Sequence, residues 1–273
     1  MKKHLIAALF VLGLGATFTA CTDQKKAQET EQAATELTDS VKEKAKELFK
    51  SVHAERMNML NEVVVTKDGV KTMPVKFFLA LDMADKAQTN YEKNQLLGIY
   101  LADKETNDFV FVKDANNAKE RAAVIAKLVA ETNKKYDVAA VDSLSKEEMI
   151  SMTDSLTAQS VEEALENNTA DEMLVNFTYA VIESTLNKIG VAEMVGEYDQ
   201  QEIFKDILGR KDMLANIVEL YNLLKPYYKS LEEMAELAEK IDAVVKADEA
   251  TADEALGNFI TFCKEHRGKI AAY

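Results

Sequence analysis

The chain has 273 residues, a formal net charge of −14 and only two cysteines. Nucleic acid is excluded as an expected partner, because binding it requires clustered cations that neutralise phosphates. Hydrophobic residues make up 47% of the sequence, whereas Trp is absent and Pro occurs twice. A composition with so few helix breakers and so many apolar side chains favours long helices around a sizeable core.

The first 20 residues have the order of a bacterial export signal. Residues 2–4 are basic, residues 5–14 form an apolar run, and small residues lead up to Cys21. The apolar run is short for a transmembrane helix, which needs about 20 apolar residues. We therefore expect residues 1–20 to be a cleaved signal peptide. The alternatives are an ordinary signal peptide with a chance cysteine and an uncleaved anchor.

The segment Phe18-Thr19-Ala20-Cys21 resembles the lipobox of bacterial envelope lipoproteins, whose cysteine becomes the first mature residue and is lipidated. Phe18 stands where Leu is commonest, and this looser form is similar to the lipoboxes of Bacteroidetes lipoproteins. The resemblance implies acyl chains such as palmitate on Cys21. Such chains hold a protein on a membrane without spanning it.

The residues after the lipobox bear on where the anchor lies. Thr22 is not the Asp that retains enterobacterial lipoproteins in the inner membrane, and only one acidic residue, Asp23, follows closely. The resemblance therefore implies attachment to the outer membrane, with the periplasmic face favoured over the cell surface.

Cleavage after residue 20 removes two lysines and takes the formal charge from −14 to −16. Residues 21–35 are rich in Gln, Glu, Lys and Ala without a large apolar side chain, which predicts a tether after the lipidated cysteine. Residues 36–273 are predicted to form the helical-bundle domain, with a subdivision near residues 136–145 as an alternative. Cys263 is the only other cysteine, so an internal disulfide is excluded.

Apolar side chains recur at steps of three and four residues from Leu37 to Met59, which predicts a first helix ending near Asn61. Pro74 suits the first turn of a second helix, which is expected to run to about Ala102. The β-branched and aromatic stretches in 63–72 and 109–112 are typical of strands. They leave two alternatives open, a small β-hairpin appendage or apolar loops that close a bundle.

Helix start signals, in which Ser, Thr, Asp or Asn precedes Glu by three residues, recur along the rest of the chain. They are Asn117/Glu120, Ser145/Glu148, Ser160/Glu163, Thr169/Glu172, Asp199/Glu202 and Thr251/Glu254. The segment from Met173 to Ile189 is apolar around nearly its whole circumference, which predicts a buried central helix. These patterns together predict an all-α fold, an irregular multi-helix bundle.

Cys263 and His266 lie three residues apart and could share one face of the last helix. A thiolate beside an imidazole can act as a nucleophile with its base, or the two can bind a metal. The alternative is structural, because Cys263 continues the apolar stripe of Leu256 and Phe259. We favour the structural interpretation.

Four aromatic side chains are weaker candidates. His53 lies beside the apolar stripe of the first helix and is expected to be a boundary residue whose hydrogen bonds are satisfied. Tyr221, Tyr227 and Tyr228 could form an aromatic platform for a ligand, with packing around Pro226 as the favoured alternative.

The sequence contains no His-Glu-x-x-His, Gly-x-Ser-x-Gly or phosphate-loop pattern. We therefore expect no enzyme activity, no cofactor and no metal. The hypothesis is a lipid-anchored envelope protein, attached through Cys21, that serves as a binding or scaffold module for an envelope protein partner. A carrier of a small apolar ligand or lipid in an inter-helix pocket is the first alternative. A Cys/His-dependent hydrolase or metal protein is the second.

Overall fold

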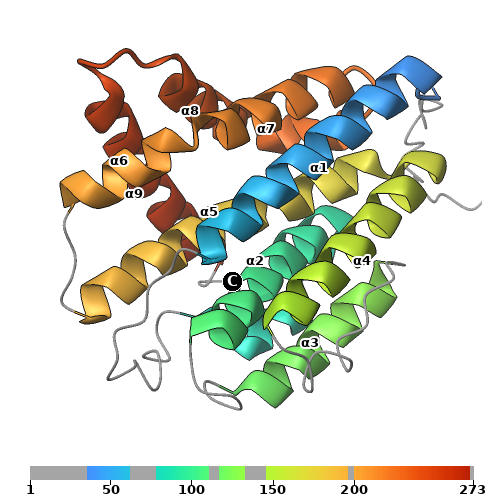
Figure 1. Cartoon of the computed structure of the whole chain (residues 1–273). Coiled ribbons are helices and arrows are strands. Elements are labelled where there is room, and N and C mark those ends of the chain that lie inside the picture. The colour runs from blue at the N-terminus through green and yellow to red at the C-terminus, as the bar shows by residue number, and fades with distance from the viewer. Residues whose placement is uncertain (1–35, 62–77, 111–116, 133–145, 196–199, 271–273) are drawn as a thin grey trace, which may run out of the picture. The chain divides into compact units, whose positions relative to one another are not determined.

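The computed structural model of the chain describes residues 36–61, 78–110, 117–132, 146–195 and 200–270, which form part of one compact unit that begins at Ala34. All the elements in these residues are helices, as Figure 1 shows, so the predicted all-α multi-helix fold is confirmed. In chain order they are α1 (Asp39–Asn61), the short 3-10 helix η1 (Leu81–Asp85), α2 (Asn90–Val110), α3 (Ala118–Glu131), α4 (Lys146–Glu166), α5 (Ala170–Val195), α6 (Gln200–Gly209), α7 (Lys211–Leu224), the 3-10 helix η3 (Lys229–Met234), α8 (Ala235–Lys246) and α9 (Ala252–Ile270). The predicted signal peptide, Cys21, the tether and the subdivision near 136–145 lie outside the described residues.

α5 is the central helix, as its apolar sequence predicts. Every residue from Met173 to Thr185 is buried, and α5 packs against α1, α2, α4, α7 and α9. Its most extensive contact is with α2, where a Cβ atom on Gly98 would lie 2.3 Å from the backbone oxygen of Asn176. The glycine therefore permits the close crossing of these two helices.

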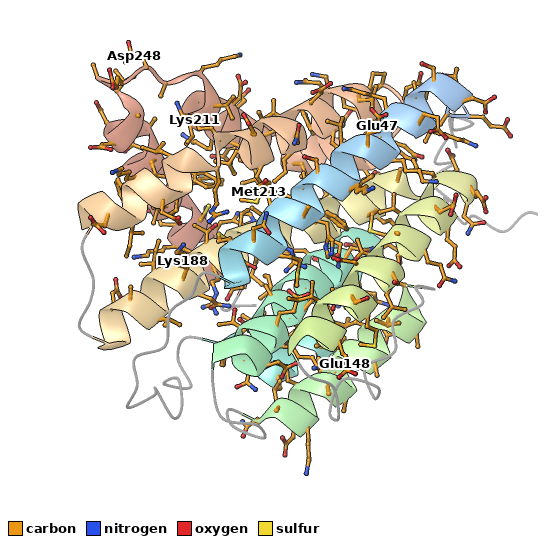
Figure 2. All side chains as sticks on the ribbon, viewed as in Figure 1. Glu47, Glu148, Lys188, Lys211, Met213 and Asp248 are labelled. Carbon is orange, nitrogen blue, oxygen red and sulfur yellow. The ribbon has the colours of Figure 1, made fainter. Side chains whose placement is uncertain are left out.

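α1 packs its apolar stripe against α5, and its end at Asn61 is where the periodicity predicts it. Phe49 and Val52 are fully buried, and the rings of Phe49 and Phe177 meet edge to face with their centroids 5.2 Å apart. α7 also packs against α1, and its buried Met213 is labelled in Figure 2 where the two helices lie side by side.

The helix predicted from Pro74 to Ala102 is wrong in its first half, because α2 begins only at Asn90. The carboxylate of Glu92 accepts a hydrogen bond from the backbone N–H of Thr89 at 2.9 Å. The backbone N–H of Glu92 in turn donates to the Thr89 hydroxyl at 3.1 Å. This reciprocal capping box starts α2.

The start signals at Thr169 and Thr251 directly precede α5 and α9, as predicted. The prediction of a helix start at Ser160 is wrong, because this residue lies inside α4. Asn117 precedes α3, but its backbone is left-handed, with φ of 56°, and its side chain makes no capping hydrogen bond. The helix therefore begins where the sequence predicts it, by a different local geometry.

For residues 109–112 the sequence leaves a strand or an apolar loop open, and both are wrong for Phe109 and Val110, which belong to the last turn of α2. Propagation of an established helix outweighs the local β-propensity of these two residues. The other stretch with these two alternatives, 63–72, lies outside the described residues. Among the helices that the structure describes, none is long and apolar enough to cross a membrane.

The core contains paired polar groups between the apolar layers. The Asp103 carboxylate is fully buried and accepts hydrogen bonds from Arg121 at 3.1 Å and from the Asn187 amide at 3.0 Å. Glu183 accepts two hydrogen bonds from Nε of Arg267, both at 2.8 Å. Buried polar groups are stable when they are paired in this way.

Candidate functional site in the groove between α1 and α4

Two side-chain pairs show how α1 and α4 lie against each other. Lys46 Nζ on α1 is 2.8 Å from Glu162 Oε1 on α4, and His53 Nε2 is 2.7 Å from Asp154 Oδ1. From the first pair to the second, the residue on α1 lies seven positions later in the chain, whereas the residue on α4 lies eight positions earlier. The helices are therefore antiparallel neighbours, as Figure 1 also shows.

A groove of about 400 Å³ runs between these helices. This volume lies within the range of small-molecule sites. Most of the exposed surface inside the groove is apolar. Its described lining residues are Lys46, Lys50, His53, Ala54, Met57 and Asn58 from α1, with Ile150, Asp154, Thr157, Ala158 and Val161 from α4.

His53 is the polar residue that the two helices hold most firmly at this groove. Its side chain is buried, with 5% of the residue exposed, whereas the Asp154 side chain that binds it is 53% exposed. A carboxylate can only accept a hydrogen bond, so Nε2 of His53 carries the hydrogen of this pair. The position of His53 on α1 and of Asp154 on α4 therefore fixes the ring of the histidine.

The other ring nitrogen, Nδ1, is buried without a hydrogen-bond partner among the described residues. Burial lowers the pKa of His53 from its ordinary 6.5, and the Arg56 cation lowers it further. The hydrogen bond to Asp154 acts in the opposite direction but does not outweigh these two effects. The imidazole is consequently neutral at neutral pH, and Nδ1 carries a lone pair. An unsatisfied buried acceptor costs about 1–3 kcal/mol.

A second pocket of about 50 Å³ adjoins the groove, among α1, α2, α3, α4 and α5. His53 and Thr157 line both spaces, so they form the wall between them. Arg56 and Glu105 line this second pocket and form a two-pronged ion pair, whose second contact, from Nη2 to Oε1, is 3.1 Å long. The cavity has room for a few atoms of the size of water.

The groove also carries two lysines, in a protein that is strongly acidic overall. Lys46 is held by Glu162 through the contact described above. Lys50 is exposed and forms no ion pair with any residue that the structure describes. The site thus combines a mainly apolar lining with two lysines and with one histidine whose ring is held by Asp154.

The chain matches no family model, no curated protein and no solved structure. In the described ranges no three His, Cys, Asp or Glu side chains are grouped so that they could hold a metal ion.

Cys263 and His266 do not form a reactive pair in the structure. Cys263 is 3% exposed, and burial raises the pKa of its thiol, which disfavours the thiolate. His266 Nε2 lies 2.8 Å from the Tyr179 hydroxyl and 3.2 Å from Nε2 of Gln95. The adjacent cavity, about 10 Å³, holds one water molecule at most. The geometry favours the structural interpretation of both residues.

The three candidate tyrosines do not stack on one another in the described structure. Tyr228 is buried and donates its hydroxyl to Asn168 Oδ1 at 3.0 Å, and burial raises its pKa to about 12. Tyr221 is half-buried, with the Lys225 ammonium 5.2 Å from its ring centre. Their positions favour the packing interpretation over the ligand platform.

The sequence interpretation of His53 as a satisfied boundary residue is wrong, because the side chain is buried and one of its nitrogens is unpaired. The sequence does not indicate that Asp154 faces His53, or that Arg56 and Glu105 lie beside it. The sequence shows only a histidine, His53, beside the apolar stripe of an amphipathic helix. This pattern does not specify which residues of α2 and α4 face the histidine.

Proposed function

We propose that the protein is a lipid-anchored envelope binding protein whose α1–α4 groove takes a small amphiphilic ligand. The observation that carries this proposal is the groove itself, an apolar space of about 400 Å³ with a fixed, buried imidazole in its wall. Ligand sites typically combine an apolar lining with a few oriented polar groups.

The proposed role is binding rather than catalysis. Among the described residues Asp154 is the hydrogen-bond partner of His53, and no described hydroxyl is hydrogen-bonded to this imidazole. A general base needs a nucleophile within hydrogen-bond reach. The groove offers apolar contact area, which is sufficient for a carrier or a sensor.

The anchoring part of the proposal rests on the lipobox. Acyl chains on Cys21 hold the protein at the outer membrane, facing the periplasm, and the segment of 21–35 separates the folded domain from the lipid. An envelope protein partner would then receive or deliver the ligand at that surface.

Substitution of the lipobox cysteine tests the anchor. We expect Cys21→Ser to leave the protein unlipidated and to remove it from the detergent-soluble membrane fraction of its own host. Cys263→Ala, which leaves the lipobox intact, should fractionate with the wild type. Recovery of Cys21→Ser as a processed, membrane-bound protein would contradict the proposal.

Filling the groove tests the ligand. Ala158 is an exposed alanine that lines the groove, whereas Ala243 is an exposed alanine on α8 outside it. Proteins extracted in mild detergent would be analysed by native mass spectrometry. We expect a small molecule to accompany the wild type and Ala243→Phe, and to be lost from Ala158→Phe. A stoichiometric protein in place of any small molecule would contradict the carrier and favour the scaffold.

A further inference from the structure

The charged side chains that line the groove differ in how far their charges are compensated. Lys46 Nζ is 2.8 Å from Glu162 Oε1, and this hydrogen bond raises the pKa of Lys46. The carboxylates of Glu43 and Glu166 act in the same direction. The charge of Lys46 is therefore offset by acidic neighbours on α1 and α4.

Asp154 brings an uncompensated negative charge to the groove. His53 donates the 2.7 Å hydrogen bond to Oδ1 of Asp154, but this histidine is neutral because burial lowers its pKa. The Asp154 side chain is 53% exposed, and no described lysine or arginine is paired with it. A cationic group of a ligand in the groove can therefore reach this carboxylate.

Lys50 brings a positive charge to the same lining. It is exposed and forms no ion pair with a described residue. Lys50 lies three residues before His53 on α1, a spacing that puts two Cβ atoms about 5–6 Å apart on one face of a helix. Because His53 is bonded to Asp154, the positions of Lys50 and Asp154 lie about one helical turn apart along the groove.

These two opposite charges disfavour a head group that carries one sign only. A cation would be attracted by Asp154 and repelled by Lys50, and an anion would meet the reverse. A head group that contains both an ammonium and an anionic group can place each of them beside its opposite charge.

The apolar lining continues past this pair of charges. Met57 lies four residues after His53 on α1, and Ile150 lies four residues before Asp154 on α4. Because the two helices are antiparallel, Met57 and Ile150 lie on the side of Asp154 that faces away from Lys50. An alkyl chain attached to the head group has apolar contacts there.

We infer that the groove ligand is a single-chain zwitterionic amphiphile, with its ammonium beside Asp154, its anionic group beside Lys50 and its alkyl chain toward Met57 and Ile150. This inference rests on the proposed function and adds the chemical class of the ligand. Single-chain phospholipids with an ammonium-bearing head group have this chemistry.

The test titrates three probes with the same ten-carbon chain into the mature protein, each below the concentration at which it forms micelles. The probes are zwitterionic decylphosphocholine, cationic decyltrimethylammonium and anionic decyl sulfate. The affinity of each probe is compared between variants, so differences in hydrophobicity between the head groups cancel.

Two substitutions each remove one of the charges. Asp154→Asn keeps an oxygen that accepts the hydrogen bond from His53. We expect it to weaken the binding of decylphosphocholine and decyltrimethylammonium by about two- to fivefold, the effect of one exposed ion pair, and not that of decyl sulfate. Lys50→Gln should weaken decylphosphocholine and decyl sulfate by a similar factor, and not decyltrimethylammonium. Decylphosphocholine alone should respond to both substitutions.

Matched controls change the net charge equally at exposed positions of α9. Asp253→Asn and Lys264→Gln lie outside the groove and should leave the affinity for all three probes unchanged. Ala158→Phe, which fills the groove, should abolish the binding of all three.

The possible failures are distinguishable. If no probe binds to the wild type, the proposed function fails. If decylphosphocholine binds but only one of the two groove substitutions weakens it, the head group is recognised through one charge and the zwitterion is overturned. If neither weakens it, or the α9 controls weaken it equally, the groove binds ligands without recognising the charge of the head group. Lys50→Gln does not touch the pair of His53 and Asp154, so unchanged binding of decylphosphocholine to this variant overturns the inference by itself.

Discussion

Both histidines of the folded domain are held in the neutral form by their surroundings. Burial and the Arg56 cation lower the pKa of His53. Burial, and next the Lys269 cation, lower the pKa of His266. In the unfolded chain both return to the ordinary value of 6.5. Protonation therefore favours the unfolded chain at either position.

The lowered pKa of His53 determines how the free energy of unfolding changes with pH. Below pH 6.5 the unfolded chain binds a proton at His53 that the folded protein does not bind, until the pH passes the lowered pKa. The free energy of unfolding should then fall by at most about 1.4 kcal/mol per pH unit for this residue. We expect His53→Gln, which does not titrate, to lose this part of the decline in urea unfolding measured from about pH 8 to pH 5.

Above pH 6.5 the difference between His53→Gln and the wild type should be constant, because His53 is neutral in both states. His266→Gln serves as the matched control. It should remove only the part of the decrease in unfolding free energy that the protonation of His266 causes. Parallel stability curves for wild type and His53→Gln over the whole range would show that the folded His53 has an ordinary pKa.

The buried pair of Glu183 and Arg267 yields a prediction about stability. The Glu183 side chain is 1% exposed, and Nη2 of Arg267 adds a contact of 2.7 Å to the two from Nε. Arg267→Met leaves a buried carboxylate without this cation, which should cost about 3–5 kcal/mol. Urea unfolding at neutral pH measures the loss. Lys246→Met, which breaks an exposed pair with Asp242, should cost about 1 kcal/mol or less.

At the scale of helices, the crossing of α2 and α5 depends on the absence of a side chain at Gly98. A methyl group there would overlap the Asn176 backbone oxygen, so Gly98→Ala must push two helices of the core apart. We expect a loss of about 1–3 kcal/mol or more in the free energy of unfolding. Thermal and urea unfolding both measure it.

Gly268 supplies the control for this substitution. It is exposed within α9, and a Cβ atom there would meet nothing within 4 Å. Gly268→Ala should stabilise the protein by about 0.5–1 kcal/mol, the ordinary gain for alanine over glycine inside a helix. Equal effects of the two substitutions would mean that the helices do not cross closely at Gly98.

Helix positions follow largely from local sequence, whereas the groove does not. The start of α5 after Thr169 and the buried character of residues 173–185 are local properties, set by a capping residue and by apolar periodicity. The capping box of Thr89 and Glu92 is equally local, and the sequence contains it. The prediction nevertheless places the helix start at Pro74, because proline is also typical of a first helical turn. These features can be predicted because residues within a few positions determine them.

The pairing of His53 with Asp154 spans 101 residues and depends on the register of α1 against α4. That register is set by the packing of both helices on α5, and composition and periodicity do not encode it. The same applies to Arg56 and Glu105, which are separated by 49 residues. The sequence therefore predicts a bundle with a histidine near its core, and only the fold shows that the histidine borders two cavities.

At the scale of the whole molecule, residues from Ala34 onward form a compact unit with its own core. We expect a chain that starts at Ala34 to unfold at the same temperature as the mature protein, because the core residues are all retained. Circular dichroism during heating measures this. Removal of α9, which buries Leu256, Phe259 and Ile260, should by contrast abolish cooperative unfolding. A large drop in melting temperature for the chain from Ala34 would contradict the prediction.

The polar side chains of α5 have a consequence for the export that we propose for this protein. With 26 residues, α5 is long enough to span a bilayer, and a wholly apolar version would act as a stop-transfer segment during secretion. Glu183 lies near the middle of α5, where a charge opposes insertion by about 2.5–3.5 kcal/mol, and Thr178 and Asn187 add to the barrier. If the protein is exported as we propose, the groups that are paired inside the folded protein would also oppose insertion of its central helix into the inner membrane.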